Sequence, residues 1–564
     1  QSAVLAVTFA AAGGQGYGDN QGFVTMSGAD HDAHLPAWAR VTSATALADV
    51  LLIDNDFSDL VQDYDYLWYY TSTLETLGLS YVVWNVDDYV GGDRTIPYAT
   101  TLAAFPHILH FTGDNYEPDG TYPVHTGLTA LDLDSLTEYV NGGGRYIAMG
   151  QDYASAMTND SFFYNYRLGA AYIQDSISNE EQPNQLIVPT ADAPDILGGM
   201  IVDLTQTRKY TASGPLSGDQ EVPPVATATT GRYTLRYDVD QKLLEIEVRV
   251  TPTATTPITV TGSHIHEGAA GANGPVLFTL FNTPTFVTDT LAFGGSFVLT
   301  QVQEDALLAD GLYVNVHTAA YPAGEVRSQI TPTAVINQRY VDELDNVLHD
   351  GSANPNPMPG DPFGESTLGS TRILSYGGPF SNFGGAVGLA NRQQPSLEVP
   401  GTTYAGRSIY TSFGLEGMSE VMNPSYGIMP ASRVSLVGAF LSWLDAEPGT
   451  VIVTPTAEVS STLYTFTYAF TSGWQPGVKA QALAGPQRVR WDFGDGSPYV
   501  EAGNDTNASH QYVCSADNVH TARIEITDVY GLVTLGSVVV DATDNCNPTG
   551  IVPTGIYLPI IGKQ

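Results

Sequence analysis

The segment GGRYIAMGQD, residues 143–152, decides the fold of this chain. Its apolar centre, Tyr146 to Met149, predicts a buried strand that opens into a turn. The residues before it predict a helix with a capping box at Ser135–Glu138 and a glycine stop. A helix, a glycine turn, an apolar strand and a polar turn are typical of a parallel α/β sheet, in which chemistry lies beyond the carboxyl ends of the strands. The side chains of Gln151 and Asp152 therefore decide whether this domain is catalytic.

This segment resembles the class I glutamine-amidotransferase-like fold, a flavodoxin-like sheet. The resemblance implies that this turn corresponds to the one that carries the cysteine nucleophile in the enzymes of that family. Gln151 stands there in this chain, and an amide is not a nucleophile. The Gly-Gln-Asp version resembles non-catalytic domains of secreted multidomain bacterial proteins. We therefore expect a protein that is not an enzyme. The alternative is a hydrolase that uses the carboxylates at the sheet end as acid and base.

Length and composition restrict the class of protein. A chain of 564 residues suggests three to four domains. With 21 basic and 60 acidic residues the net charge is −39, which argues against nucleic acid and against an anionic membrane surface as partners. No run of 18 apolar residues is present, so we expect no transmembrane segment. No signal peptide is recognised, and Gln1 fits either a mature N-terminus or the end of a proteolytic fragment.

The order of predicted elements divides the chain into five parts. A split flavodoxin-like domain carries an inserted Greek-key β-sandwich and is followed by an immunoglobulin-like sandwich. The expected boundaries are 1–45 for an N-terminal arm, 46–208 with 333–447 for the α/β domain, 209–332 for the insertion, 450–543 for the last sandwich, and 544–564 for a tail. The α/β domain is expected to contain strands at 49–53, 81–86, 107–111 and 407–416, and helices at 67–77, 338–348 and 431–444.

The insertion has motifs of its own. Ser263–Gly268 reads SHIHEG, and Tyr313–Thr318 reads YVNVHT. Together with Leu216–Pro224 they resemble the CHRD domain, named after chordin, which implies a sandwich related to copper/zinc superoxide dismutase.

Three histidines of these motifs form a predicted site. His264 and His266 face the same side of a strand, because side chains alternate with a period of two. His317 on a partner strand completes a three-imidazole site for Cu or Zn. The alternative is that the imidazoles only bond strand ends and pack the motif. We expect no redox chemistry, because the further metal ligands of superoxide dismutase are missing.

A second candidate site lies at the carboxyl ends of the parallel strands. Asp54, Asp56 and Asp152 follow predicted strands, and carboxylate oxygens are ligands that Ca²⁺ prefers. The alternative role for these carboxylates is in helix N-caps and Asx turns. No cofactor is certain from the sequence.

The last sandwich is indicated by Arg490–Ser497, which reads RWDFGDGS and resembles the signature of the PKD domain, an immunoglobulin-like module of extracellular proteins. Cys514 and Cys546 are the two cysteines of the chain. We expect them to form a disulfide, as is typical of an oxidising, extracellular setting. The alternative is two unpaired buried thiols.

Both ends of the chain carry runs that are apolar on both faces. A free apolar strand is an aggregation hazard unless a neighbour covers it, and strand addition to a second subunit supplies that cover. The alternative is that both ends fold back on their own chain. The residues expected at such contacts are Val4, Leu5, Val7, Phe9, Ile556, Tyr557, Leu558, Ile560 and Ile561.

These observations favour a secreted, non-catalytic structural or adhesive protein of the cell surface. We expect it to be a homo-oligomer that assembles into a filament or layer and contacts the cell surface or extracellular polysaccharide. The alternative is the accessory C-terminal region of a secreted subtilisin-like or metallo-peptidase.

Overall fold

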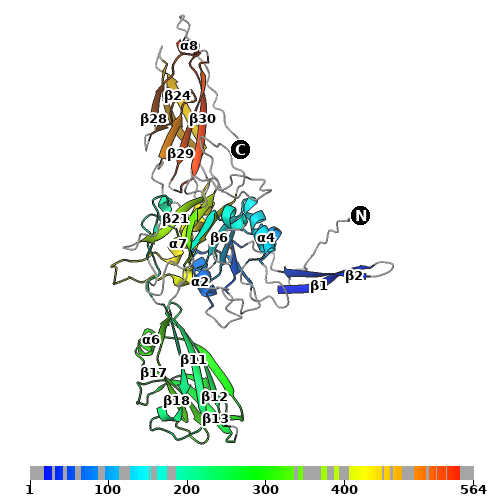
Figure 1. The fold of residues 1–564 in the computed structure, drawn as a ribbon, viewed down its shortest axis with the longest axis vertical. Coiled ribbons are helices and arrows are strands. Elements are labelled where there is room, and N and C mark those ends of the chain that lie inside the picture. The colour runs from blue at the N-terminus through cyan, green and yellow to red at the C-terminus, as the bar shows by residue number, and fades with distance from the viewer. Residues whose placement is uncertain are drawn as a thin grey trace.

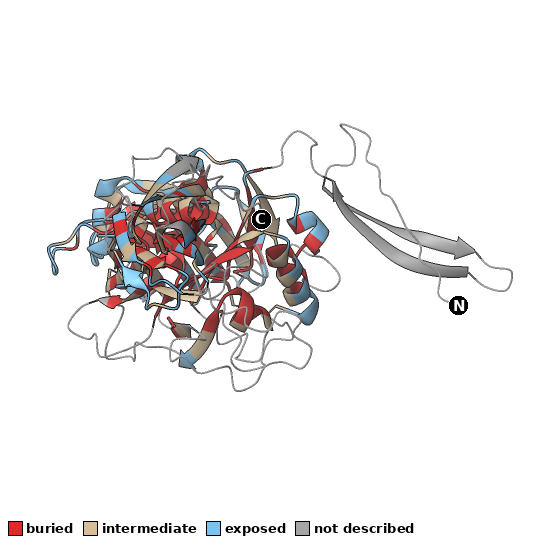
Figure 2. Cartoon of the chain, turned by 90° about the horizontal axis from the view of Figure 1, so that it is seen from above, coloured by how far each residue is buried: buried red, intermediate tan, exposed pale blue. Residues whose placement is uncertain are grey.

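The chain forms three bodies in a row (Figure 1). A central α/β domain carries one β-sandwich at each end. Seen from above, the buried residues gather toward the middle of the described part of the chain (Figure 2). The structure, a computed structural model, describes residues 48–56, 65–86, 96–113, 128–151, 153, 162–174, 186–206, 208–253, 255–335, 341–346, 370–377, 386–392, 406–447, 450–457, 462–472, 488–502, 507–515, 517–528 and 530–546, together with the backbone of two strands near the N-terminus.

The central domain is built on a nine-stranded sheet in the order β4-β3-β5-β6-β23-β22-β21-β8-β9. Its first five strands are parallel: β4 (Tyr81–Asn85), β3 (Val50–Asp54), β5 (His107–Phe111), β6 (Arg145–Met149) and β23 (Arg407–Thr411). Most of these strands are buried on both faces, as their continuous apolar sequences require. An antiparallel half completes the sheet: β22 (Gly388–Arg392), β21 (Ser370–Gly377), β8 (Leu186–Pro189) and β9 (Val202–Asp203).

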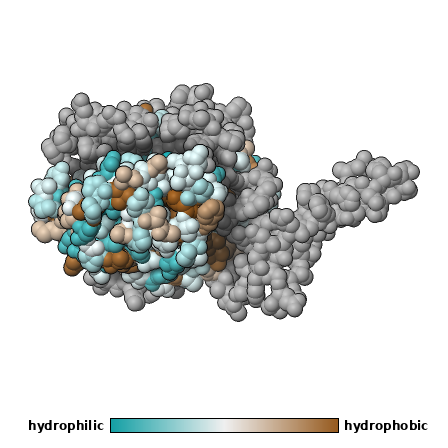
Figure 3. All heavy atoms as spheres, turned by 90° about the horizontal axis from the view of Figure 1, so that it is seen from below, coloured by the Kyte–Doolittle hydropathy of each residue, from teal (hydrophilic) through white to brown (hydrophobic). Residues whose placement is uncertain are grey.

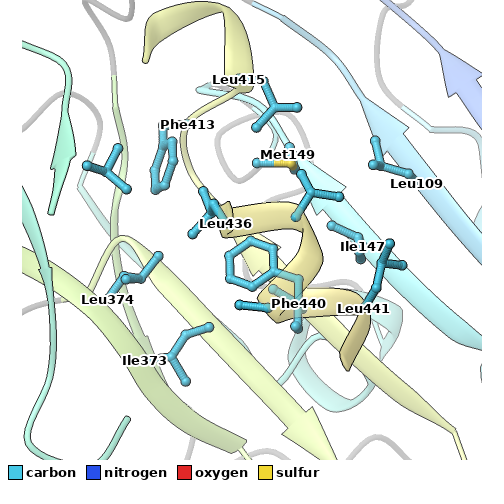
Figure 4. Close-up of a cluster of buried hydrophobic side chains, with 14 of the residues drawn as sticks. Leu109, Ile147, Met149, Ile373, Leu374, Phe413, Leu415, Leu436, Phe440 and Leu441 are labelled. Atoms are coloured by element: carbon cyan, nitrogen blue, oxygen red, sulfur yellow. The ribbon is translucent and has the colours of Figure 1, made fainter. Parts of the chain in front are cut away.

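Helices cover both faces of this sheet. The helices α2 (Leu67–Leu77) and α7 (Arg433–Asp445) share one core with the sheet. Figure 4 shows Leu436, Phe440 and Leu441 of α7 beside Ile147 and Met149 of β6. The opposite face is covered by α3 (Ala99–Leu102), α4 (Ala130–Asn141) and the π-helix η1 (Phe163–Arg167).

Three local predictions are wrong. The strand expected at 407–416 ends at Thr411, and Leu415–Gly417 forms a short 3-10 helix. The helix α4 begins at Ala130, because Thr129 and Asp132 form its capping box, and Ser135 lies inside the helix. The segment expected to be helical at 338–348 contains the strand β20 (Glu343–Asn346), which pairs with β7 (Ala170–Gln174). The backbone of Leu344 exchanges hydrogen bonds with that of Ala386 and its side chain is buried, so tertiary pairing overrides the helical propensity of the segment.

The inserted sandwich has two antiparallel sheets around one core. The first sheet has the order β16-β12-β11-β10-β19: β16 (Leu291–Val298), β12 (Leu243–Thr251), β11 (Thr230–Asp238), β10 (Lys209–Leu216) and β19 (Thr333–Val335). The second contains β14 (Val276–Phe281), β13 (Ile258–Glu267), β17 (Leu312–Thr318) and β18 (Val326–Ile330), with β15 (Thr285–Val287) beside β13. A helix, α6 (Gln301–Leu308), leads into β17.

The insertion enters and leaves through adjacent strands. Lys209 at the start of β10 is the register partner of Val335 at the end of β19. The inserted sandwich is therefore closed at its base.

Seen from below, the described surface of the molecule mixes hydrophilic areas with small separate apolar patches (Figure 3).

The last sandwich also has two sheets, packed around Trp491. One contains β24 (Thr450–Ala457), β25 (Leu463–Ser472) and β28 (Asn507–Gln511), and the other β27 (Val500–Glu501), β26 (Arg488–Asp492), β29 (Val519–Thr527) and β30 (Val533–Asp541). A disulfide joins Cys514, after β28, to Cys546 in α8 (Thr543–Cys546), with 5.4 Å between the Cα atoms.

Near the N-terminus, the backbones of β1 (Gly18–Ser27) and β2 (Asp32–Val41) pair as an antiparallel hairpin. The sequence had indicated only a glycine-rich arm there. The nine terminal residues expected at subunit contacts lie outside the described residues, so that expectation stays a prediction.

In the described part of the chain, no helix combines the length and the apolar character needed to cross a bilayer.

Candidate metal centre

The paired strands β13 and β17 bring three histidines together. His264 and His266 alternate with Ile265 on β13, so they share one face, and His317 lies on β17 opposite Gly262. Gly262 precedes His264 by two residues on the same face. A Cβ atom at Gly262 would lie 3.5 Å from Cε1 of His264, which is an ordinary van der Waals contact, so Gly262 packs directly beside this imidazole.

One ring nitrogen from each histidine lies within 4.8 Å of the other two. The ring centroids of His264 and His317 are 5.0 Å apart, and those of His264 and His266 are 5.6 Å apart. Three buried nitrogens have no hydrogen-bond partner: Nδ1 of His264, Nε2 of His266 and Nε2 of His317. In the described part of the chain, this is the one cluster of three or more such side chains that could hold a metal ion.

Two backbone carbonyls fix the orientation of the rings. Nδ1 of His266 lies 3.0 Å from the carbonyl oxygen of Gly274, and Nδ1 of His317 lies 3.0 Å from that of Pro322. A carbonyl only accepts hydrogen bonds, so each Nδ1 carries the proton and each Nε2 keeps a free lone pair. This is the arrangement by which outer partners orient metal-ligating histidines.

The surroundings keep the imidazoles neutral. Burial lowers the pKa of His264, and the neighbouring His317 and His266 lower it further. Burial is also the main cause of the lowered pKa values of His266 and His317. Metal binding requires the neutral imidazole, so the ligand form prevails near neutral pH.

An aromatic and a cation support His266 from behind. The ring of Tyr313 stacks on His266 with centroids 4.8 Å apart, and the guanidinium of Arg327 lies 3.3 Å from the centroid of Tyr313. Arg327 donates hydrogen bonds to the carbonyls of Ala272 and Ala269. Tyr313 was not predicted as a neighbour of the site from the sequence, although it lies four residues before His317 and so shares the same face of β17. Gly274 and Pro322 lie in turns that flank the two histidine-bearing strands. Their glycine and proline residues are typical of turns, so the sequence could have located these turns but not their hydrogen bonds to the histidines.

The carboxylates proposed for calcium take another role where they are described. Asp54 and Asp56 are buried, and Oδ2 of Asp56 accepts the backbone N–H of Tyr66 at 2.8 Å, next to the start of α2. Asp152 lies outside the described residues. The calcium site stays a prediction. Asp56 takes the alternative role, because its carboxylate bonds to the backbone at the start of a helix.

The turn after β6 is tightly filled. Gln151 is only 3% exposed, and a Cβ atom at Gly150 would lie 1.8 Å from Oγ1 of Thr112. Under the turn, Nδ1 of His110 lies 2.7 Å from the hydroxyl of Tyr146, and burial lowers the pKa of His110 to about 3. His110 is fully buried and its Nε2 lies 3.3 Å from the side-chain nitrogen of Asn55, and its pairing with Tyr146 was not predicted from the sequence.

Comparisons with known proteins find matches to parts of the chain. No curated protein matches the chain. Eight chains of solved structures match, among them the PKD1 domain from the Vibrio cholerae metalloprotease PrtV, with 14% identity and a TM-score of 0.13 over 17% of this chain and 95% of that one. The family model of the CHRD domain matches residues 212–330, a range that contains His264, His266 and His317.

Proposed function

We propose that this chain is a secreted, non-catalytic structural protein of the cell surface that assembles through its terminal segments. The CHRD domain and the disulfide fit an extracellular protein. The observation that carries the structural role is that the central domain contacts both sandwiches through buried residues, from which we expect little movement between the three bodies.

The first junction joins the α/β domain to the inserted sandwich. Arg433 of α7 is 4% exposed, and its guanidinium lies 2.7 Å from a carboxylate oxygen of Asp240 and 3.0 Å from one of Glu420. The hydroxyl of Tyr69 donates to Asp238 at 2.5 Å. Charges that are buried and fully bonded hold a fixed geometry, because breaking such a pair leaves an uncompensated charge.

The second junction joins the α/β domain to the last sandwich. Tyr530 and Leu532, in the turn between β29 and β30, belong to the hydrophobic core of the α/β domain. The indole N–H of Trp443 in α7 donates to the carbonyl of Tyr530 at 2.8 Å. An apolar turn that enters the neighbouring core, with its backbone bonded there, restricts rotation between the two domains.

The non-catalytic role is supported by the end of the parallel sheet. The parallel strands follow the order second, first, third, fourth, fifth along the chain, and flavodoxin-like folds have this order. At the position where a nucleophile is expected, the buried Gln151 offers only an amide.

The assembly part is tested by sedimentation and electron microscopy of the intact chain and of a variant without residues 1–12. We expect the intact protein to associate more strongly with salt, since screening reduces the repulsion between chains of net charge −39. The truncated protein should remain folded and monomeric. If both proteins sediment identically as monomers, the assembly proposal is wrong.

The location and the absence of catalysis need separate measurements. Antibody labelling of intact cells should detect the protein at the surface, and a purely internal pool contradicts secretion. The purified chain should leave peptide and glycoside substrates intact. Hydrolysis that is lost in Asp152→Asn would overturn the non-catalytic reading.

A further inference from the structure

We propose that His264, His266 and His317 bind one Zn²⁺ or Cu²⁺ ion at a three-nitrogen site with an open coordination position. This inference goes beyond the structural role and does not depend on secretion or assembly. It rests on the geometry of the two histidine-bearing strands.

The unpartnered nitrogens are the first argument. A buried polar atom without a hydrogen bond is unfavourable, so a protein rarely keeps several of them together without a ligand. The alternative, in which the imidazoles only pack and bond strand ends, accounts for the Nδ1 atoms of His266 and His317, because both form hydrogen bonds with carbonyls. It leaves Nε2 of both rings and Nδ1 of His264 without partners. A cation held by all three lone pairs satisfies these atoms at once.

Distance is the second argument. Three nitrogens at about 2.0–2.1 Å from a tetrahedral ion stand roughly 3.3 Å apart. The ring nitrogens lie within 4.8 Å of one another, so a closure of up to about 1.5 Å completes the site. Small rotations of three side chains supply this closure, while the strands that carry them keep their pairing.

The donor set selects the metal. Three neutral imidazoles suit Zn²⁺ and Cu²⁺, whereas Ca²⁺ and Mg²⁺ require oxygen ligands. No carboxylate or thiolate of the described residues joins the cluster, so the bound ion keeps its double positive charge. A three-ligand site also leaves a fourth position for water or a small anion. His264 and His317 are only partly buried as residues, although the three unpartnered nitrogens themselves are buried.

The test uses the full chain after metal removal with a chelator. Zn²⁺ and Cu²⁺ are titrated separately by calorimetry, and the metal content is measured after gel filtration. We expect one equivalent of at least one ion to remain bound. Competition between the two ions then identifies the preferred one. No retained ion in either titration overturns the proposal.

Variants assign the site. His264→Ala and His317→Gln should each weaken binding at least tenfold, because each removes one imidazole from the cluster. The matched control is His510→Ala, because His510 lies in the other sandwich and bonds to Asp495. Equal binding by the double variant His264→Ala/His317→Gln and the unsubstituted protein would place the ion elsewhere and overturn the assignment.

Two further measurements separate ligand loss from misfolding and probe the open position. Added metal should raise the thermal midpoint of the unsubstituted protein and of His510→Ala, but not those of the variants at His264 and His317, whose circular dichroism should stay native. In the Co²⁺-substituted protein, azide should change the visible absorption. An unchanged spectrum means that a fourth protein ligand closes the site, which contradicts the open position. None of these outcomes bears on secretion or assembly.

Discussion

Asp528 makes the stability of the last sandwich depend on pH. This carboxyl group is 1% exposed and sits where the turn between β29 and β30 enters the α/β core. Its Oδ1 accepts the backbone N–H groups of Tyr530 and Leu532, each at 2.7 Å, and Oδ2 has no hydrogen-bond partner among the described residues. Burial raises its pKa to about 7, although the nearby Arg392 acts in the opposite direction.

The sign follows from proton binding. Below about pH 4 Asp528 is protonated in both the folded and the unfolded chain, so the full stability is present. Between about pH 4 and pH 7 the folded state holds the proton and the unfolded state has lost it, so the free energy of unfolding falls as pH rises. The rise of the pKa from 3.8 to about 7 corresponds to a total loss of about 4 kcal/mol. About 3 kcal/mol of this loss lies between pH 5 and pH 8.

The perturbation is Asp528→Asn, which stays neutral at every pH and keeps one oxygen for the two N–H groups. Hydrogen–deuterium exchange of peptides from β29 and β30 reports the opening free energy of this sandwich inside the full chain. We expect the unsubstituted protein to lose stability between pH 5 and pH 8 and the variant to lose much less.

Asp541→Asn is the control in the same sandwich. A hydrogen bond with Thr543 lowers the pKa of Asp541, so its contribution is present at neutral pH and is lost only as pH falls below about 4. This variant should keep the pH dependence of the unsubstituted protein between pH 5 and pH 8. If Asp528→Asn also keeps that dependence, the buried carboxyl is not its source.

Three other changes test the framework. Arg433→Met should destabilise the junction by about 1.5–3 kcal/mol, because Asp240 keeps its ion pair with Arg208 but loses the charge-assisted hydrogen bond from Arg433. Calorimetry should then resolve separate unfolding of the two domains, and an unchanged profile contradicts this. Cys514→Ser removes the disulfide that closes a loop with a sequence separation of 32, and it should lower the free energy of unfolding by about 3–4 kcal/mol. The urea midpoint should fall and no longer change with reductant. A midpoint equal to that of the oxidised, unsubstituted protein refutes this prediction. Gly150→Ala should cost about 1–3 kcal/mol or more through overlap with Thr112, and Thr112→Ala in the same chain should restore part of it; no thermal shift argues against the overlap.

Regular local patterns made part of the fold predictable. The parallel strands of the sheet are continuous apolar runs, and the helix predicted at 67–77 has the bounds of α2. The face shared by His264 and His266 follows from the period of a strand alone. Their approach to His317 was expected from that shared face and from the second histidine-bearing strand, and the structure places the three residues together.

The antiparallel half of the central sheet was not predictable in the same way. Asn391 and Arg392 of β22 are buried polar residues, which argue against a central strand when the sequence is read locally. Their partners lie far along the chain: Asn391 donates to the carbonyl of Arg167, and Arg392 donates to that of Ala446. A buried polar group is stable only when its hydrogen-bond partner is in place. Because these partners are distant in the sequence, no short stretch around β22 predicts a buried strand.

The same limit applies to the candidate metal centre. The strand period identifies the ligand residues, but the free nitrogen on the rings of His266 and His317 depends on the carbonyls of Gly274 and Pro322. Those carbonyls lie in loops whose backbone path is set by the whole sandwich. The tautomers, and with them the direction of the lone pairs, are therefore a property of the folded domain.

The closed base of the insertion has a mechanical consequence. Lys209 and Val335 are register partners on neighbouring strands, so the chain enters and leaves the inserted sandwich at nearly one point. A pulling force applied at the two ends of the chain passes through the central domain and crosses the base of the insertion only between β10 and β19. The β13 and β17 strands lie outside this load path. Under such a pulling force, we expect the three histidines to keep their geometry while the central domain carries the load.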